Sequence, residues 1–174
     1  VSVELDSMPR YAAVVLAADR TGKDPITQYT GAACKAFAPV DGIPMIIRVL
    51  DALSGCEQIA TIILCGPPQS LHDQCPELKQ RIASGQVKWT PNLDSPSRSA
   101  ESGVGLVPND MPVLLTTADH ALLTSGLINK FLQLLSDKIE LSEDKIEKIR
   151  KLYNNDRINF IESLAASGMV QEEL

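Results

Sequence analysis

Three charged side chains in this sequence have the types and the spacing that a phosphate site needs. Arg20 lies in a polar loop, residues 18–24, which follows the apolar run 11–17, and Lys35 comes after that loop. Far downstream, Asp119 follows a second apolar run, residues 112–117. Cationic side chains neutralise phosphate oxygens, and a carboxylate is an oxygen ligand that Mg²⁺ accepts. The three residues therefore predict a site for the phosphates of a nucleotide and a metal ion.

The apolar runs that precede these residues have the character of buried strands. A further run, residues 59–65, is short, rich in β-branched residues and ends at a Gly-Pro-Pro turn, which is typical of a strand buried on both faces in a parallel sheet. The expected strands are residues 11–17, 59–65, 86–90 and 112–117, and the expected helices are 44–53, 76–84, 97–107 and 124–135. This alternation predicts an α/β fold of three layers around a mostly parallel, Rossmann-like sheet.

The position of the charged residues within that fold is a further prediction. In open α/β sheets, ligands bind outside the carboxyl ends of the strands. Lys35 and Asp119 both follow such ends in the sequence. We therefore expect the Lys35 ammonium and the Asp119 carboxylate to meet at one rim of the sheet.

The sequence changes character after Leu135. Residues 142–153 and 157–166 predict two amphipathic helices with a break at 154–156, hence a C-terminal helical hairpin. We expect an α/β domain over residues 1–137 and a helical extension over residues 138–174. The apolar stripes of that extension pack against the α/β body, against each other or against a partner, and a homo-oligomer formed through these helices is one such arrangement.

Composition excludes several classes of protein. The formal net charge is −6, and neither part of the chain is basic, so nucleic acid is not an expected partner. The four cysteines form no CxxC pair, so a zinc site is not expected. Free cysteines suit a reducing cytoplasm, and no apolar run approaches the roughly 20 residues that a membrane span requires. We expect a cytoplasmic protein without a membrane partner.

Some of these residues also have plainer interpretations. Lys35 fits a solvated surface lysine, Asp119 fits a turn residue, and Arg20 fits a surface ion pair with a neighbouring carboxylate. His120 is expected to shape the turn after the last strand rather than to act as a base. His72 is expected at the surface, and Trp89 at a strand edge.

Two segments resemble a known family. Residues 35–50, KAFAPVDGIPMIIRVL, with the strand and loop before them, resemble the nucleotidyltransferase domain of the molybdenum-cofactor guanylyltransferase-like (MobA-like) group. This group belongs to the superfamily of sugar-phosphate and isoprenoid nucleotidyltransferases. Residues 114–124, LLTTADHALLT, resemble its later motif of strand, Asp, small turn and helix. The resemblance covers roughly residues 10–135 and implies a fold of the nucleotide-diphospho-sugar transferase type.

The resemblance implies a reaction and a catalytic set. The family transfers a nucleoside monophosphate from an NTP to a phosphate or hydroxyl acceptor and releases pyrophosphate. By resemblance, Arg20 touches the triphosphate, Lys35 neutralises the α-phosphate region and Asp119 holds Mg²⁺. General chemistry agrees, because phosphoryl transfer needs positioning and cations near the non-bridging oxygens.

The resemblance also implies a nucleotide-binding set. Backbone groups after the first strand lie along the base and ribose, and a serine-containing helix start borders the base. At the matching positions this chain has Leu16, Ala17 and Ala18, and then Ser97, Arg98 and Ser99.

These observations lead to one hypothesis and one main alternative; a different Rossmann-like nucleotide binder is a weaker possibility, since the absence of GxGxxG after the first strand argues against NAD. The first is a Mg²⁺-dependent nucleotidyltransferase that acts on a small phosphorylated or cofactor-like acceptor. The alternative is a catalytically degenerate relative that serves as a binding or oligomerisation module. Asp19 favours the alternative, since it stands where the family usually has glycine and a carboxylate repels a triphosphate.

Overall fold

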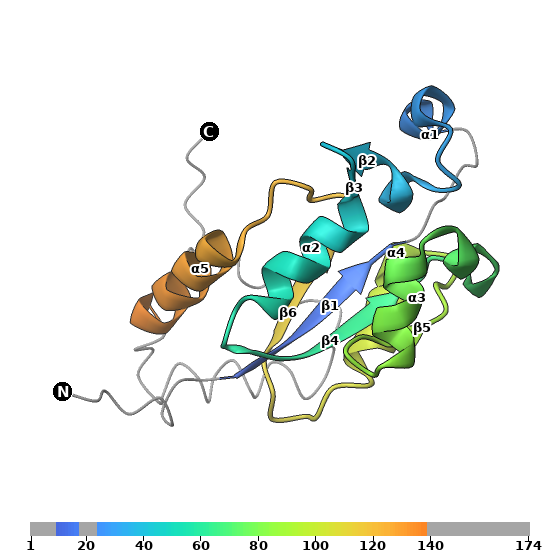
Figure 1. Cartoon of the computed structure of the whole chain (residues 1–174). Coiled ribbons are helices and arrows are strands. Elements are labelled where there is room, and N and C mark those ends of the chain that lie inside the picture. The colour runs from blue at the N-terminus through green and yellow to red at the C-terminus, as the bar shows by residue number, and fades with distance from the viewer. Residues whose placement is uncertain (1–9, 18–23, 139–174) are drawn as a thin grey trace. The chain divides into compact units, whose positions relative to one another are not determined.

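The computed structural model describes residues 10–17 and 24–138 and contains an α/β fold (Figure 1). Its main strands are β1 (Tyr11–Leu16), β4 (Ile59–Cys65), β5 (Lys88–Thr90) and β6 (Val113–Thr117). Its helices are α1 (Pro25–Thr30), α2 (Met45–Ser54), α3 (Pro76–Ala83), α4 (Pro96–Val104) and α5 (Ser125–Lys138). A two-stranded hairpin, β2 (Pro39–Val40) and β3 (Ile43–Pro44), and 3₁₀ turns at Lys35–Phe37 and Gln69–Gln74 complete the described elements.

All pairings in the four-stranded sheet are parallel, in the order β5-β4-β1-β6. The central strand β1 pairs with both β4 and β6, and its last residue, Leu16, lies opposite Cys65 and Thr117. The four predicted strands and the mostly parallel sheet are therefore confirmed. Because these strands end in register, the segments that follow them emerge along one rim.

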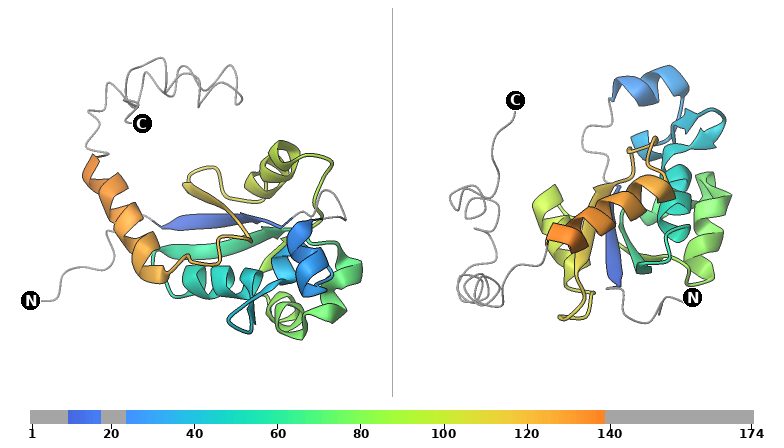
Figure 2. Two further views of the ribbon diagram at one scale, coloured as in Figure 1. Left: turned by 90° about the horizontal axis from the view of Figure 1, so that it is seen from above. Right: turned by 90° about the vertical axis from the view of Figure 1, so that its left-hand side faces the viewer.

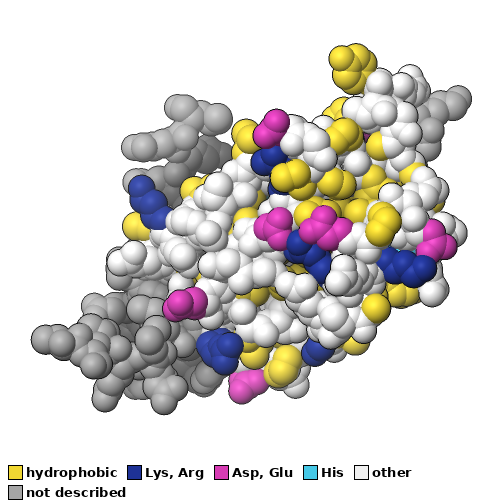
Figure 3. All heavy atoms as spheres, in the orientation of Figure 1, with side chains coloured by type: hydrophobic (Ala, Val, Ile, Leu, Met, Phe, Trp, Pro, Cys, Tyr) yellow, Lys and Arg dark blue, Asp and Glu magenta, His cyan; other side chains and the backbone are white. Residues whose placement is uncertain are grey.

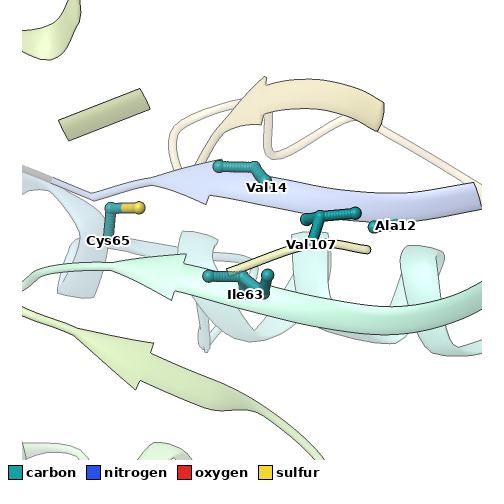
Figure 4. Close-up of a cluster of buried hydrophobic side chains, with 5 residues drawn as sticks. All are labelled: Ala12, Val14, Ile63, Cys65 and Val107. Carbon is teal, nitrogen blue, oxygen red and sulfur yellow. The ribbon is translucent and has the colours of Figure 1, made fainter. Parts of the chain in front are cut away.

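Helices cover both faces of this sheet, which explains why its strands are apolar on both sides. Figure 2 shows α4 on one face, with α2 and α3 on the other. On the α4 face, side chains from β1 and β4 and one residue that follows α4 form a core cluster drawn in Figure 4: Ala12, Val14, Ile63, Cys65 and Val107. The three-layer arrangement predicted from the alternation of strands and helices is confirmed.

Gly103 sets how closely α4 approaches the sheet. A Cβ atom at this position would lie 2.6 Å from the Cys65 Sγ atom and 2.8 Å from a Val14 methyl carbon. The absence of a side chain therefore lets the helix rest directly on β1 and β4. This contact fixes the helix that begins beside the carboxyl end of β5.

Charged residues join the two helices on the opposite face. The Arg81 guanidinium of α3 lies 2.7 Å from a carboxylate oxygen of Asp51, at the end of α2, and 2.7 Å from one of Glu77. Figure 3 shows acidic and basic side chains interspersed on the face it presents, rather than one continuous field of a single sign.

No structure is assigned in the sequence analysis to the segment between Lys35 and the predicted helix over 44–53, which is confirmed as α2. This segment forms a 3₁₀ turn and the β2–β3 hairpin before α2 begins at Met45. Asp41 and Gly42, at the hairpin turn, both have positive φ, 53° and 75°. An Asp-Gly pair is the usual sequence for such a turn, so the local signal was present in the sequence.

The C-terminal region is only partly described. The chain divides into two compact units, with the boundary between Phe131 and Leu132. The predicted helix over 124–135 is confirmed as α5, whereas the predicted hairpin over residues 142–166 lies outside the described residues. Within the described part of the chain, every helix is too short or too polar to span a bilayer.

Candidate nucleotide site

An ion pair joins the two charged residues that the sequence analysis expected to meet. The Lys35 Nζ atom lies 2.6 Å from the Asp119 Oδ2 atom, although the residues are 84 positions apart in sequence. The exposed fraction of each side chain is 35%, so the pair is accessible to a ligand. The predicted convergence at the rim of the sheet is observed.

Lys35 is positioned by its uncharged neighbours. It begins a 3₁₀ turn in which the Ala38 amide donates to the Lys35 carbonyl at 3.0 Å. Cys34, Ala36, Phe37 and Ala38 are all buried, and the Ala38 carbonyl accepts from the first residue of α2. Because the residues on both sides are packed into the core, the lysine side chain leaves the backbone from a fixed point.

Asp119 is held from two directions. The Thr117 hydroxyl donates to its Oδ1 atom, and Lys35 donates to Oδ2. The bond from Lys35, with the bond from Thr117, holds the pKa of the Asp119 carboxyl below its ordinary value of 3.8, against the opposing effect of partial burial. The carboxylate is therefore ionised at neutral pH, which is the form that binds cations.

His120 lies in the turn beside this carboxylate. Its Nδ1 atom is 3.0 Å from the Thr116 hydroxyl, and its carbonyl accepts from the Leu123 amide at 2.9 Å. These contacts are those of a residue that shapes the turn, as the sequence analysis expected.

The ends of β1, β4 and β5 meet beside the same rim. Gly66, directly after β4, has a φ of 78°, and its amide donates to the Thr90 carbonyl at 2.9 Å. A Cβ atom at Gly66 would lie 3.2 Å from both the Ala17 carbonyl oxygen and the Asn92 side chain. Only glycine fits this junction without strain.

The predicted nucleotide-binding residues after β1 are partly described. The Leu16 carbonyl accepts from the Ala118 amide at 2.9 Å, and the Ala17 amide donates to the Cys65 carbonyl at 2.9 Å. These two groups extend the sheet pairing to the rim beside Asp119. Ala18 and Arg20 lie outside the described residues, so their predicted roles stay predictions.

The predicted serine-containing helix start is found at α4. The Ser99 hydroxyl donates to the Ser95 carbonyl at 2.9 Å and accepts from the Leu93 amide at 2.8 Å, and its side chain is buried. Arg98 is exposed and pairs with Asp94 at 2.7 Å. The contacts of Ser99 stabilise the loop between β5 and α4, while Ser97 is exposed in the first turn of the helix.

The expectation that His72 lies at the surface was wrong. The side chain is buried, and its Nε2 atom is 3.2 Å from the Pro67 carbonyl oxygen, which also accepts from Trp89 Nε1 at 3.0 Å. The two rings meet edge to face, with centroids 5.1 Å apart. Burial arises because the 3₁₀ turn after β4 folds back over Trp89, and no periodic pattern signals that turn in the sequence. Trp89 itself lies on the edge strand β5, as expected.

The Asp119 carboxylate is available to a metal ion at this site. Within residues 10–17 and 24–138, no three acidic, histidine or cysteine side chains gather as a metal-binding group. Mg²⁺ nevertheless binds to one or two carboxylates and completes its shell with waters and phosphate oxygens. An ionised and accessible Asp119 fits that requirement when a nucleotide supplies the phosphates.

The structure is an α/β domain with a cation and a carboxylate, Lys35 and Asp119, paired at the carboxyl rim of its parallel sheet. The family model of the MobA-like NTP transferase domain matches residues 13–146. The match covers most of the sequence, so the chain belongs to the MobA-like NTP transferase family, and its general class is that of nucleotidyltransferases. A comparison with curated proteins finds no match.

Solved structures show the same fold. The chain is similar to 4-diphosphocytidyl-2C-methyl-D-erythritol synthase from Anaerococcus prevotii, with a TM-score of 0.55 at 17% identity over 73% of this chain. It is also similar to a hypothetical transferase from Thermus thermophilus, with a TM-score of 0.52 at 23% identity over 75% of this chain. The similarity spans 51% and 47% of those two chains, about half of each.

Proposed function

We propose that this protein transfers a nucleoside monophosphate from an NTP to a small phosphorylated or cofactor-like acceptor and releases pyrophosphate. The observation that carries the proposal is the Lys35–Asp119 pair, 2.6 Å apart at the carboxyl rim of the sheet. A cation and a carboxylate at this position supply what a metal–triphosphate complex requires.

The reaction exchanges one phosphorus–oxygen bond for another. An oxygen of the acceptor's phosphate or hydroxyl attacks the α-phosphorus, and the bond from that phosphorus to the oxygen bridging to the β-phosphate breaks. Pyrophosphate leaves with the bonding electron pair, and a hydroxyl acceptor also loses its proton. Lys35 neutralises the non-bridging oxygens at the α-phosphate, and Arg20 is proposed to contact the rest of the triphosphate.

Asp119 is the proposed ligand for Mg²⁺. The bonds from Lys35 and Thr117 keep its carboxylate ionised, and about a third of the side chain is accessible. When bound, Mg²⁺ would neutralise charge on the triphosphate and on the departing pyrophosphate. Asp119 and the waters and phosphates around the ion suffice for its coordination.

The proposed nucleotide-binding roles of the other residues follow from where these residues lie in the fold. We propose that the backbone of Leu16, Ala17 and Ala18 borders the nucleotide, with the helix start at 97–99 beside the base. We propose that the reaction takes place in the cytoplasm, a reducing compartment that suits the four free, buried cysteines. Nucleic acid and membranes are not proposed as partners.

A pyrophosphate-release assay tests the proposal. The protein is incubated with Mg²⁺, each of the four NTPs and a panel of phosphorylated acceptors, and nucleotide binding is measured by calorimetry. Pyrophosphate should form with one NTP, and Lys35→Gln should slow its release by about 10²–10³-fold because a charge-stabilising group is lost.

The control variant is Lys79→Gln, which removes the same charge from a lysine paired with Asp73 on the protein surface. It should leave the rate unchanged. If no NTP binds at millimolar concentration, the transferase proposal is rejected in favour of a degenerate binding module. Light scattering would then measure whether that module self-associates.

A further inference from the structure

One edge of the parallel sheet is open. Strand β6 ends the order β5-β4-β1-β6, and among the strands of residues 10–17 and 24–138 its single neighbour is β1. Strands of parallel sheets are normally covered, and an open edge with unpaired backbone groups is a template for another strand. The outer side of β6 is therefore a candidate docking surface for an extended chain.

The hydrogen bonds between β6 and β1 show which backbone groups face the open side. The Ala12 amide donates to the Pro112 carbonyl at 2.9 Å, and at the other end of the strand the Ala118 amide donates to Leu16 at 2.9 Å. Because the residues of a strand alternate in the side to which they bond, the even-numbered residues of β6 face β1. Three residues present amide and carbonyl groups to the open side: Val113, Leu115 and Thr117. Pro112 has no amide hydrogen, but it faces β1, so the open side keeps all three donors.

Leu115, the middle residue of β6, also presents an apolar side chain. It lies in register with Val14 of β1, which is fully buried in the cluster of Figure 4, yet Leu115 is 51% exposed. Helix α4 rests on β1 and β4 through Gly103, so it covers Val14 and leaves the neighbouring Leu115 uncovered. The matching partner is therefore a strand that brings an apolar side chain to the same face.

A second copy of β6 meets this requirement. The sequence after α5 predicts helices over 142–153 and 157–166, not a strand that would extend the sheet. In an antiparallel pair about a two-fold axis at Leu115, this residue lies opposite its own copy, and Val113 lies opposite Thr117. All three face the open side, so each pair is of the hydrogen-bonded kind. We propose that β6 pairs antiparallel with β6 of a second copy of this chain, which gives one continuous sheet across a dimer.

The side chains around the proposed axis are compatible with this pairing. Directly opposite residues of an antiparallel pair lie on the same face, so the two copies of Leu115 cover each other. Exposed Asp110 lies as far before Leu115 in the sequence as exposed His120 lies after it. Antiparallel pairing therefore brings each acidic residue toward an imidazole rather than toward a like charge. The two Lys35–Asp119 pairs come to lie at opposite ends of the joined strands.

Amide hydrogen exchange of the unmodified full chain, followed by NMR, tests the pairing. Sedimentation velocity from about 10 µM to about 1 mM should show a dimer at the upper end, since a strand pair is a small interface. The amides of Leu114 and Thr116 bond to β1 and should exchange slowly at every concentration. The amides of Val113 and Leu115 should exchange fast in the monomer and about tenfold or more slowly once the dimer predominates.

Two variants at the axis test its position. Leu115→Lys and Leu115→Glu each place like charges directly opposite each other, so each variant alone should be monomeric. An equimolar mixture of the two should regain a dimer, because opposite charges then face each other. The matched control is Leu122→Lys, the same change at a leucine that is 85% exposed in the turn after β6, and it should dimerise like the wild type. If a variant does not fold, the exchange measurement on the unmodified chain decides the question.

Three results would overturn the proposal. A monomer at about 1 mM whose Leu115 amide exchanges fast has an open edge, and a monomer whose Leu115 amide exchanges slowly covers that edge with another part of the same chain. A dimer that persists in Leu115→Lys, or a mixture that stays monomeric, places the contact elsewhere, for example on the predicted C-terminal helices. These readouts use no nucleotide, so the proposed transferase function is tested separately.

Discussion

Single residues at this site owe their positions to uncharged neighbours. Lys35 stands between buried residues of a 3₁₀ turn, and Asp119 follows a buried strand end and a threonine that bonds to it. The charged groups are accessible while their backbones are fixed by the core. Because the core fixes both backbones, Lys35 and Asp119 form an ion pair at the surface with less of the conformational freedom that usually weakens surface ion pairs.

The lowered pKa of Asp119 predicts how the ion pair contributes to stability. Because the folded carboxyl has a pKa below the 3.8 of the unfolded chain, the contribution of the pair is fully present above that value and is lost as the pH falls through the folded pKa. The difference in melting temperature between wild type and Asp119→Asn should be constant from about pH 5 to about pH 8 and shrink at lower pH. A difference that already shrinks near neutrality would contradict the assignment.

Sequence reasoning located the ion pair but not the contacts around it. Lys35 and Asp119 were found because each follows a recognisable strand or motif, and parallel strands bring their carboxyl ends to one rim. Thr117 was not singled out, since a threonine at the end of a strand is common. His72 was misplaced because its burial depends on Trp89, 17 residues further along the chain, which meets the His72–Pro67 turn only in the folded protein.

At the scale of elements, the packing of α4 depends on one residue. A methyl group at Gly103 would overlap Cys65 and Val14, at 2.6 Å and 2.8 Å. Gly103→Ala should therefore lower the free energy of unfolding by about 1–3 kcal/mol, the usual cost of overpacking a core, as measured by urea denaturation.

Gly126→Ala provides the control for that substitution. It places the same methyl group in helix α5, where the nearest atom is 4.0 Å away. Alanine favours a helix over glycine by about 1 kcal/mol or less, so this variant should be as stable as the wild type or slightly more stable. Equal effects of the two substitutions would show that α4 does not rest on the sheet as described.

The elements also show where prediction from sequence ends. The four strands and the helices α2 to α5 were predicted because their apolar periodicity extends over enough residues to be recognised. Helix α1 and the 3₁₀ turns span three to six residues, too few for an apolar periodicity to be recognised. Only its caps, Asp24 and Gly31, mark helix α1 in the sequence.

At the scale of the whole molecule, the net charge predicts that the protein does not bind nucleic acid. With a net charge of −6, and with acidic and basic side chains interspersed on the face drawn in Figure 3, the protein is not expected to attract a polyanion. Fluorescence anisotropy with a labelled DNA duplex at low salt should show no binding at micromolar protein. Binding that weakens steeply with added salt would contradict this expectation.

The hydrogen bond from Trp89 to Pro67 has a practical consequence. Trp89 is the only tryptophan in the sequence, and its indole is anchored beside the Gly66 junction, where the ends of three strands meet. The fluorescence emission of the protein's tryptophan therefore reports on the environment of this junction, next to the rim where the nucleotide is proposed to bind. The protein contains a native optical probe, so ligand binding and unfolding are both measurable without attaching a dye.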